Sequence, residues 1–269
     1  MDAQDIRDLV SRFLRGCGLV YPPMVYDNKL EEDCIADAVR RKYITDEDQT
    51  LKRFIPAGVS ISSNAYSHQR QDIQIFVAIW TALLVYLDDV GDKDVERIRA
   101  FNYRFVTGSR HEDAMLNHLT EMLREMPAMF GRIEADLMVI STMNGLTSLL
   151  IEHEIKDVKL EPSSYRFPTF VRGMTGAADA DILSFYKEQL SGDTVNRVSL
   201  ISQCRGISPG DALNELVDEG INAHQRVLSI LSSDEKALAA YKSFAQGFVG
   251  FHTNLSRYRL HELGLGDRN

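Results

Sequence analysis

The chain has 269 residues, of which 44% are hydrophobic and 26% charged, so a sizeable buried core can form. A formal net charge of −9 disfavours nucleic acid and anionic membrane surfaces as main partners. Three cysteines without zinc spacing do not suggest a secreted disulfide framework, and the charged N-terminus is no signal peptide. The longest apolar run, Ile75–Leu87, is too short to span a bilayer. We therefore expect a cytoplasmic protein with no membrane span and no nucleic-acid partner.

Helical periodicity dominates the chain, and no run alternates apolar and polar residues convincingly, so we predict an all-α fold in a single domain, 1–269. Ser208 is a plausible N-cap for the helix that begins at Pro209, and residues 232–233 are a second capping pair. The polar stretch 154–168 predicts a loop that leads into a further helix. In chain order, the predicted helices are Asp2–Leu14, Glu31–Arg41, Gln71–Leu87, Asp94–Phe105, Glu112–Met129, Glu134–Ile151, Pro209–Leu231 and Asp234–Gly247.

Three aspartates, Asp88, Asp89 and Asp92, close the longest apolar helix as LVYLDDVGD. Asp88 and Asp92 are four residues apart and share a helix face, where their carboxylates can serve as hard oxygen ligands for Mg²⁺. Acids are unfavourable at a helix C-terminus, and a metal ion would compensate their charge. The alternative is a solvated acidic turn at the end of a core helix.

A second polar group lies in the segment DILSFYKE, which begins at Asp181. Ser184 and Glu188 are four residues apart, so a hydroxyl and a carboxylate can share one Mg²⁺. Lys187 beside them can meet a phosphate as a point charge. The alternative is an ordinary amphipathic helix whose aromatic residues pack inward.

Four segments together resemble the fungal trichodiene synthase family of class I terpene cyclases. They are AIWTALLVYLDDVGD, similar to the aspartate-rich motif; FPTFVR, similar to the segment with the diphosphate-sensing arginine; DILSFYKE, similar to N-D-x-x-S-x-x-x-E; and RYRL, similar to the R-Y pair. They occur in the family's order over most of the chain, roughly 31–260. Each segment is weak alone, but four in order are specific.

The resemblance implies a helical barrel with a deep apolar pocket, in which Mg²⁺ helps to ionise farnesyl diphosphate and the carbocation then cyclises. It implies that Asp88 binds Mg²⁺, that Asp89 pairs with Arg257 on closure, and that Ser184 and Glu188 hold a further Mg²⁺. The residues that it implies for the diphosphate are Arg172, Lys187, Arg257 and Tyr258. A homodimer is compatible with the sequence.

Two departures from the family pattern stand out. Ala180 occupies the position of the motif's metal-binding Asn, and our hypothesis is that Asp181 substitutes as the ligand. Only seven residues lie between Arg172 and Ala180, a span of at most roughly 25 Å, where the family places about two helices. We therefore expect a helical shell that is incomplete between Arg172 and Asp181, from a shortened isoform or a gene that lost an exon.

Two other functions compete with a sesquiterpene cyclase. A chain-elongating prenyl synthase would need two aspartate-rich motifs, whereas this sequence has one. A catalytically impaired or inactive remnant of the family is favoured by Ala180 and the missing helices. The aromatic residues Phe76, Trp80 and Tyr86 belong either to the core or to a pocket where they would stabilise carbocations, and spacing alone leaves this open.

Overall fold

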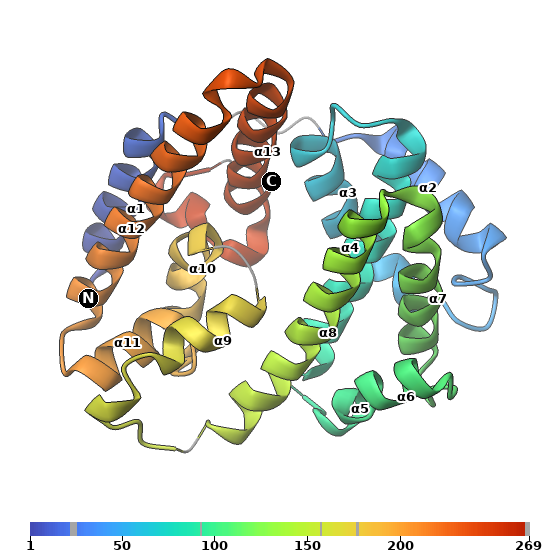
Figure 1. Ribbon diagram of the computed structural model, residues 1–269, viewed down its shortest axis with the longest axis horizontal. Coiled ribbons are helices and arrows are strands. Elements are labelled where there is room, and N and C mark those ends of the chain that lie inside the picture. Colours follow the sequence, from blue (N-terminus) through green and yellow to red (C-terminus); the bar gives the residue numbers. More distant parts are fainter. Residues whose placement is uncertain (22–25, 92, 157, 176–177, 267–269) are drawn as a thin grey trace.

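The computed structural model describes residues 1–21, 26–91, 93–156, 158–175 and 178–266, and within these ranges it contains helices and no strand. The α-helices are α1 (Ala3–Cys17), α2 (Asn28–Arg40), α3 (Ile55–Ala65), α4 (Gln71–Gly91), α5 (Glu96–Arg99), α6 (Phe101–Thr107), α7 (Ala114–Met129), α8 (Arg132–Glu154), α9 (Phe167–Thr175), α10 (Ala178–Ser191), α11 (Arg197–Arg205), α12 (Pro209–Ile230) and α13 (Glu235–Asn254). Figure 1 shows α4, α7 and α8 on one side of the molecule, with α1, α10 and α12 on the other.

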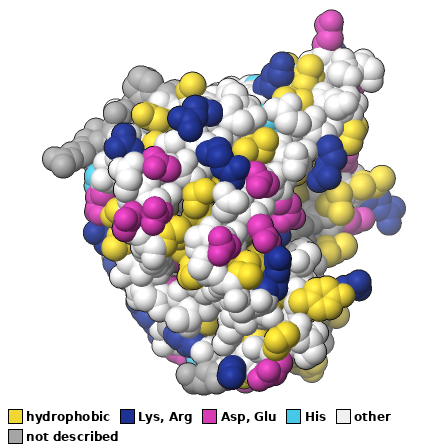
Figure 2. Space-filling view, turned by 90° about the vertical axis from the view of Figure 1, so that its left-hand side faces the viewer, with side chains coloured by type: hydrophobic (Ala, Val, Ile, Leu, Met, Phe, Trp, Pro, Cys, Tyr) yellow, Lys and Arg dark blue, Asp and Glu magenta, His cyan; other side chains and the backbone are white. Residues whose placement is uncertain are grey.

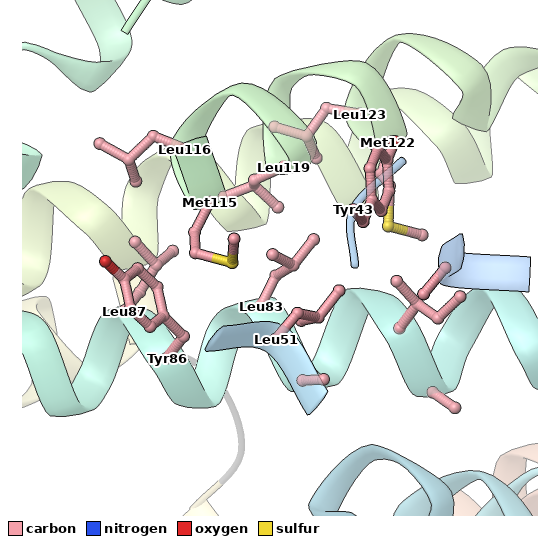
Figure 3. Close-up of a cluster of buried hydrophobic side chains, with 14 of the residues drawn as sticks. Tyr43, Leu51, Leu83, Tyr86, Leu87, Met115, Leu116, Leu119, Met122 and Leu123 are labelled. Atoms are coloured by element: carbon pink, nitrogen blue, oxygen red, sulfur yellow. The ribbon is translucent and has the colours of Figure 1, made fainter. Parts of the chain in front are cut away.

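The 21-residue helix α4 is the centre of the larger core. It packs against α2, α3, α7 and α8, and its side chains Leu83 and Leu87 face Met115, Leu119 and other apolar residues of α7 (Figure 3). By length and composition alone α4 could cross a membrane, but half of its most apolar window is buried within the protein. The burial explains why so apolar a helix can end in an acidic turn without facing lipid.

The second core joins the two ends of the chain. Phe13 of α1 and Val217 of α12 are buried together with residues of the C-terminal segment such as Leu260. Helix α10 turns Ile182 and Phe185 into this cluster. This packing fixes the orientation of α10, so that its polar residues Lys187 and Glu188 face a cavity instead of the core.

The outer face of α1 and α12 has the character of ordinary solvent-exposed surface. Figure 2 shows acidic and basic side chains interspersed there with single apolar ones. One contact across the two helices is the ion pair between Arg12 Nη1 and Asp218 Oδ1 at 2.5 Å, and Arg12 also donates to Asn214. Charges of both signs in alternation suit a soluble surface.

The all-α prediction and the predicted helices are confirmed, with differences at particular points. The helix predicted at 94–105 is two helices that meet at Ala100. Ser208 caps α12 as predicted, but α13 is capped by Asp234, whose side chain accepts from the Ala237 amide, rather than by residues 232–233. Helix α9 ends at 175 and α10 begins at 178, which confirms that no helix separates Arg172 from Asp181.

Helix α3 was not predicted, because its sequence IPAGVSISSNA is poor in strong helix formers. The structure shows why small residues occur there. A Cβ built on Gly58 would lie 1.9 Å from the carbonyl oxygen of Ala78 in α4, and one on Gly247 of α13 would lie 2.1 Å from that of Asn64. Close helix packing therefore overrides the low helix propensity of the segment.

We expect Gly58→Ala to lower the free energy of unfolding by about 1–3 kcal/mol, because the new methyl group must push α3 away from α4. Gly145→Ala is the matched control, since a Cβ there meets nothing within 4 Å, and it should be neutral or stabilising by up to about 1 kcal/mol. Urea unfolding followed by circular dichroism measures both. Equal stability of Gly58→Ala and the parent would contradict the close approach.

Candidate active site

A cavity of about 860 Å³ lies where α4, α8, α9, α10 and the start of α11 meet. Its apolar lining includes Trp80 and Leu84 of α4 and Leu146 and Leu149 of α8. The cavity therefore has the size and mixed lining of a small-molecule site. Its acidic and basic lining residues are Asp88, Glu152, Lys156, Arg172, Asp181, Lys187, Glu188, Asp193 and Arg197.

The first acidic motif reaches the cavity through Asp88, which lies near the end of α4 and keeps half of its side chain exposed. Its Oδ2 accepts a hydrogen bond from Nη2 of Arg257 at 3.0 Å. The resemblance implies Asp89 as the partner of Arg257, but the guanidinium contacts Asp88 in this structure. Asp92 lies outside the described residues, so its predicted role as a ligand stays a prediction.

The R-Y pair lies in a short 3₁₀ helix, Ser256–Tyr258, that follows α13. The Arg257 guanidinium lies 5.6 Å from the centre of the Tyr258 ring. Burial raises the pKa of Tyr258 to about 12; the charge of Arg257 opposes the rise, and the carboxylates of Asp88 and Glu188 add to it. Both acidic motifs thus act on one tyrosine, which places the R-Y pair beside them.

The second motif presents Glu188 and Lys187 of α10 to the same cavity. The Ser184 side chain hydrogen-bonds Glu188, as their spacing predicts. Burial raises the pKa of Glu188 to about 7, although the hydrogen bond from Ser184 and the charge of Lys187 oppose the rise. A carboxylate that is costly to ionise here would gain from a nearby cation.

Asp181, the proposed replacement for the missing Asn, is buried and contacts two arginines. Its Oδ2 accepts from Nε of Arg172 at 2.7 Å and from Nη1 of Arg197 at 3.3 Å, and its Oδ1 accepts from Nη2 of Arg172. Both oxygens already have guanidinium partners, which leaves fewer lone pairs for a metal ion. The role of Asp181 as a ligand stays a prediction.

Sequence reasoning missed Glu152 of α8, which lines the cavity. Ser148 Oγ hydrogen-bonds its Oε1 at 3.3 Å. The missed signal is the segment Ser148–Glu152, which repeats the S-x-x-x-E spacing of Ser184 and Glu188. Burial raises the pKa of Glu152 to about 7, and the charge of Asp88 adds to the rise.

The structure also settles which aromatic residue of α4 faces the cavity. Trp80 lines it, whereas Phe76 and Tyr86 belong to the larger core. The Tyr86 hydroxyl donates to Asp113 Oδ2 at 2.5 Å, away from the cavity lining. Only Trp80 of these three can offer its ring to a ligand in the cavity.

Oxygen donors from two helices would suit Mg²⁺. Among the residues that the structure describes, no three His, Cys, Asp or Glu side chains are grouped closely enough to hold a metal ion by themselves. Mg²⁺ commonly takes one or two protein carboxylates and completes its shell with waters and substrate phosphates. The donor set of Asp88, Ser184 and Glu188 therefore fits Mg²⁺ that is shared with a phosphate-bearing ligand.

Comparison with known proteins finds fungal terpene synthases. Residues 177–266 match the family model described as Trichodiene synthase (TRI5). The chain is 29% identical to alpha-cuprenene synthase COP6 of Coprinopsis cinerea, over 96% of this chain and 90% of the relative. It is 26% identical to monoterpene synthase 25 of Postia placenta, over 97% and 87%, and 24% identical to longiborneol synthase CLM1 of Gibberella zeae, over 98% and 89%.

The all-helical fold, with a cavity lined by carboxylates from several helices and by basic side chains, is consistent with a class I terpene synthase fold. Its relatives are fungal terpene synthases. The match to the trichodiene synthase model covers residues 177–266, and together with these relatives it supports a terpene cyclase function.

The raised pKa of Glu152 predicts a pH-dependent stability. Glutamate ionises near 4.5 in the unfolded chain but near 7 in the folded protein, so the protonated side chain favours the folded state and this contribution is lost as pH rises from about 4.5 to 7. The free energy of unfolding of Glu152→Gln should therefore equal that of the parent at pH 5. At pH 8 it should be higher by about 1 kcal/mol, which raises Tm by roughly 2–4 °C.

Melting curves between pH 5 and 8, without divalent cations, measure this effect. The matched control is Glu154→Gln, two residues along the same helix, because Glu154 is exposed and pairs with Arg99 at the surface. It should keep the parent's dependence on pH. If Glu152→Gln also keeps it, Glu152 is not the titrating group.

Proposed function

We propose that this terpene cyclase is a sesquiterpene cyclase, which ionises farnesyl diphosphate with the help of Mg²⁺, releases diphosphate and cyclises the resulting carbocation. The observation that carries the proposal is the position of Asp88 and Glu188. They are 100 residues apart in sequence and line one cavity, together with Lys187 and the ring of Trp80. Anion-binding and apolar surfaces therefore meet in one place.

The polar side of the cavity would hold the diphosphate. We propose that Asp88, Ser184 and Glu188 hold Mg²⁺, which supplies positive charge to the leaving group when bound. Arg172, Lys187, Arg257 and Tyr258 would donate hydrogen bonds to phosphate oxygens, and charge that develops on the leaving oxygen would meet donors already in position. These residues are carried over from the family motifs. Asp88, Arg172, Lys187 and Glu188 are supported by the shared cavity, and Arg257 by its contact with Asp88.

The apolar side would hold the isoprenoid chain. Trp80 and Leu84 of α4 face the cavity together with Leu146 and Leu149 of α8. Such a wall excludes water, which would otherwise capture the cation, and it folds the chain so that a ring can close. The face of an indole ring attracts a cation within about 6 Å, so Trp80 would stabilise positive charge on the chain.

Other features of the proposal come from the sequence. Because the cavity is built from helices of both cores, we regard residues 1–269 as one terpenoid synthase-like domain. A cytoplasmic location, a homodimer, and the absence of nucleic-acid and membrane partners stay predictions. The competing proposal, an inactive remnant, is favoured by Ala180 and by the two-residue connection between α9 and α10.

Incubation of the purified chain with farnesyl diphosphate and Mg²⁺ should give a cyclic hydrocarbon or alcohol, detected by gas chromatography with mass spectrometry. Chelation of Mg²⁺ should abolish the product. Asp88→Asn and Glu188→Gln should each lower kcat/KM by roughly 100-fold or more, because each removes an oxygen ligand with full charge.

Glu154→Gln is the matched control, since Glu154 is exposed and lies outside the cavity lining; it should retain the parent's activity. If the folded chain gives no product, and neither Mg²⁺ nor pyrophosphate changes its Tm, the inactive remnant is the correct description.

A further inference from the structure

Arg197, the first residue of α11, is a buried arginine to which the family motifs assign no role. Its side chain is 7% exposed and lines the cavity. Nη1 donates to Asp181 Oδ2 at 3.3 Å, and Nη2 donates to Glu219 Oε2 at 2.9 Å. Among the described residues, its buried Nε has no hydrogen-bond partner. A buried donor without an acceptor is costly, so the guanidinium has capacity for one more acceptor.

Asp181 brings this arginine close to a second one. The same carboxylate accepts hydrogen bonds from Arg172 of α9 and from Arg197 of α11, and all three residues line the cavity. Asp181 therefore holds the two guanidinium groups next to each other at the cavity wall. Glu219, the other partner of Arg197, is half exposed and so is screened by solvent.

The position of Arg197 in the cavity lining and its unpartnered Nε suit an anion in the cavity. A guanidinium presents its N–H groups in a planar fork that matches phosphate oxygens, and it stays protonated at any working pH. Arg172 is already assigned to the diphosphate by the family motif. A carboxylate that holds it beside Arg197 would present the two as a pair.

We propose that Arg197 is a further diphosphate-binding residue, and that Asp181 is a positioning residue which holds Arg172 and Arg197 together at the cavity wall. The inference rests on the proposed function in its choice of anion, the diphosphate of an isoprenoid substrate. It gives Asp181 a task other than metal ligation. The pair would also add charge to a wall where the connection between α9 and α10 is only two residues long.

Isothermal titration of the full chain with inorganic pyrophosphate in the presence of Mg²⁺ tests the role of Arg197. We expect Arg197→Gln to weaken pyrophosphate binding by about 10-fold or more, and Arg197→Lys to retain part of the affinity, because lysine keeps the charge but loses the fork. Glu219→Gln is the matched control. It removes the surface partner of Arg197 but leaves the arginine, so its pyrophosphate affinity should equal the parent's.

Measuring Tm beside pyrophosphate affinity separates an effect on folding from an effect on binding. Melting curves report the cost of losing either ion pair, and a purely structural Arg197 would change Tm but not pyrophosphate affinity. If Arg197→Gln folds and binds pyrophosphate as tightly as the parent, the assignment of Arg197 is overturned. If Glu219→Gln weakens binding as much as Arg197→Gln does, the ion pair rather than the guanidinium matters, and the assignment is again overturned.

Asp181→Asn tests the positioning role. We expect this variant to bind pyrophosphate less tightly than Arg197→Gln does, because both arginines lose their shared partner. Its affinity for Mg²⁺ in the absence of pyrophosphate should equal the parent's. A lower affinity for Mg²⁺ alone would assign Asp181 to the metal and overturn the positioning role. Unchanged affinity for Mg²⁺ would rule out the hypothesis that Asp181 replaces the missing Asn ligand.

The two proposals can fail separately. If the parent binds Mg²⁺ and pyrophosphate, and Arg197→Gln binds pyrophosphate less tightly, while farnesyl diphosphate gives no product, the anion site stands and the cyclase proposal falls. If farnesyl diphosphate is converted but pyrophosphate binding is the same in Arg197→Gln and the parent, the cyclase stands and the further inference falls. A parent that binds no pyrophosphate overturns both.

Discussion

The gathering of like charges in one buried cavity is the constraint on which the site depends. Glu152 and Glu188 line the same hollow as Asp88, and burial raises the pKa of both glutamates to about 7. A folded chain keeps such a cluster only if its other interactions outweigh the cost. The two apolar cores supply that stability, since each is built from helices that also carry a part of the cavity wall.

Arginine side chains form ion pairs with two separate carboxylates at this site. Arg257 contacts Asp88, whereas Arg172 and Arg197 contact Asp181. An anion that enters with divalent cations would find both charge types already in position, so little reorganisation would be needed on binding. The contacts of Asp181 with Arg172 and Arg197 join α10 to α9 and α11.

Periodicity predicted the helical class and most long helices, because their apolar positions recur at helical spacing. It missed α3, whose small residues serve close packing against α4 rather than helix propensity. The motif residues Asp88 and Glu188 were predicted from spacing and resemblance, and the fold brings both to one cavity. Arg197 was missed because a single charged residue carries no pattern, and Glu152 because the spacing that it shares with Ser148 is not specific by itself; only the tertiary arrangement shows that both line the cavity.

Ala180 is the strongest argument for an inactive remnant, and the cavity weakens it. Loss of the motif's Asn removes one oxygen donor, but the wall opposite α10 offers Glu152, hydrogen-bonded by Ser148 in the same spacing that joins Ser184 to Glu188. Glu152 therefore gives the cavity a carboxylate that the comparison of motifs does not count.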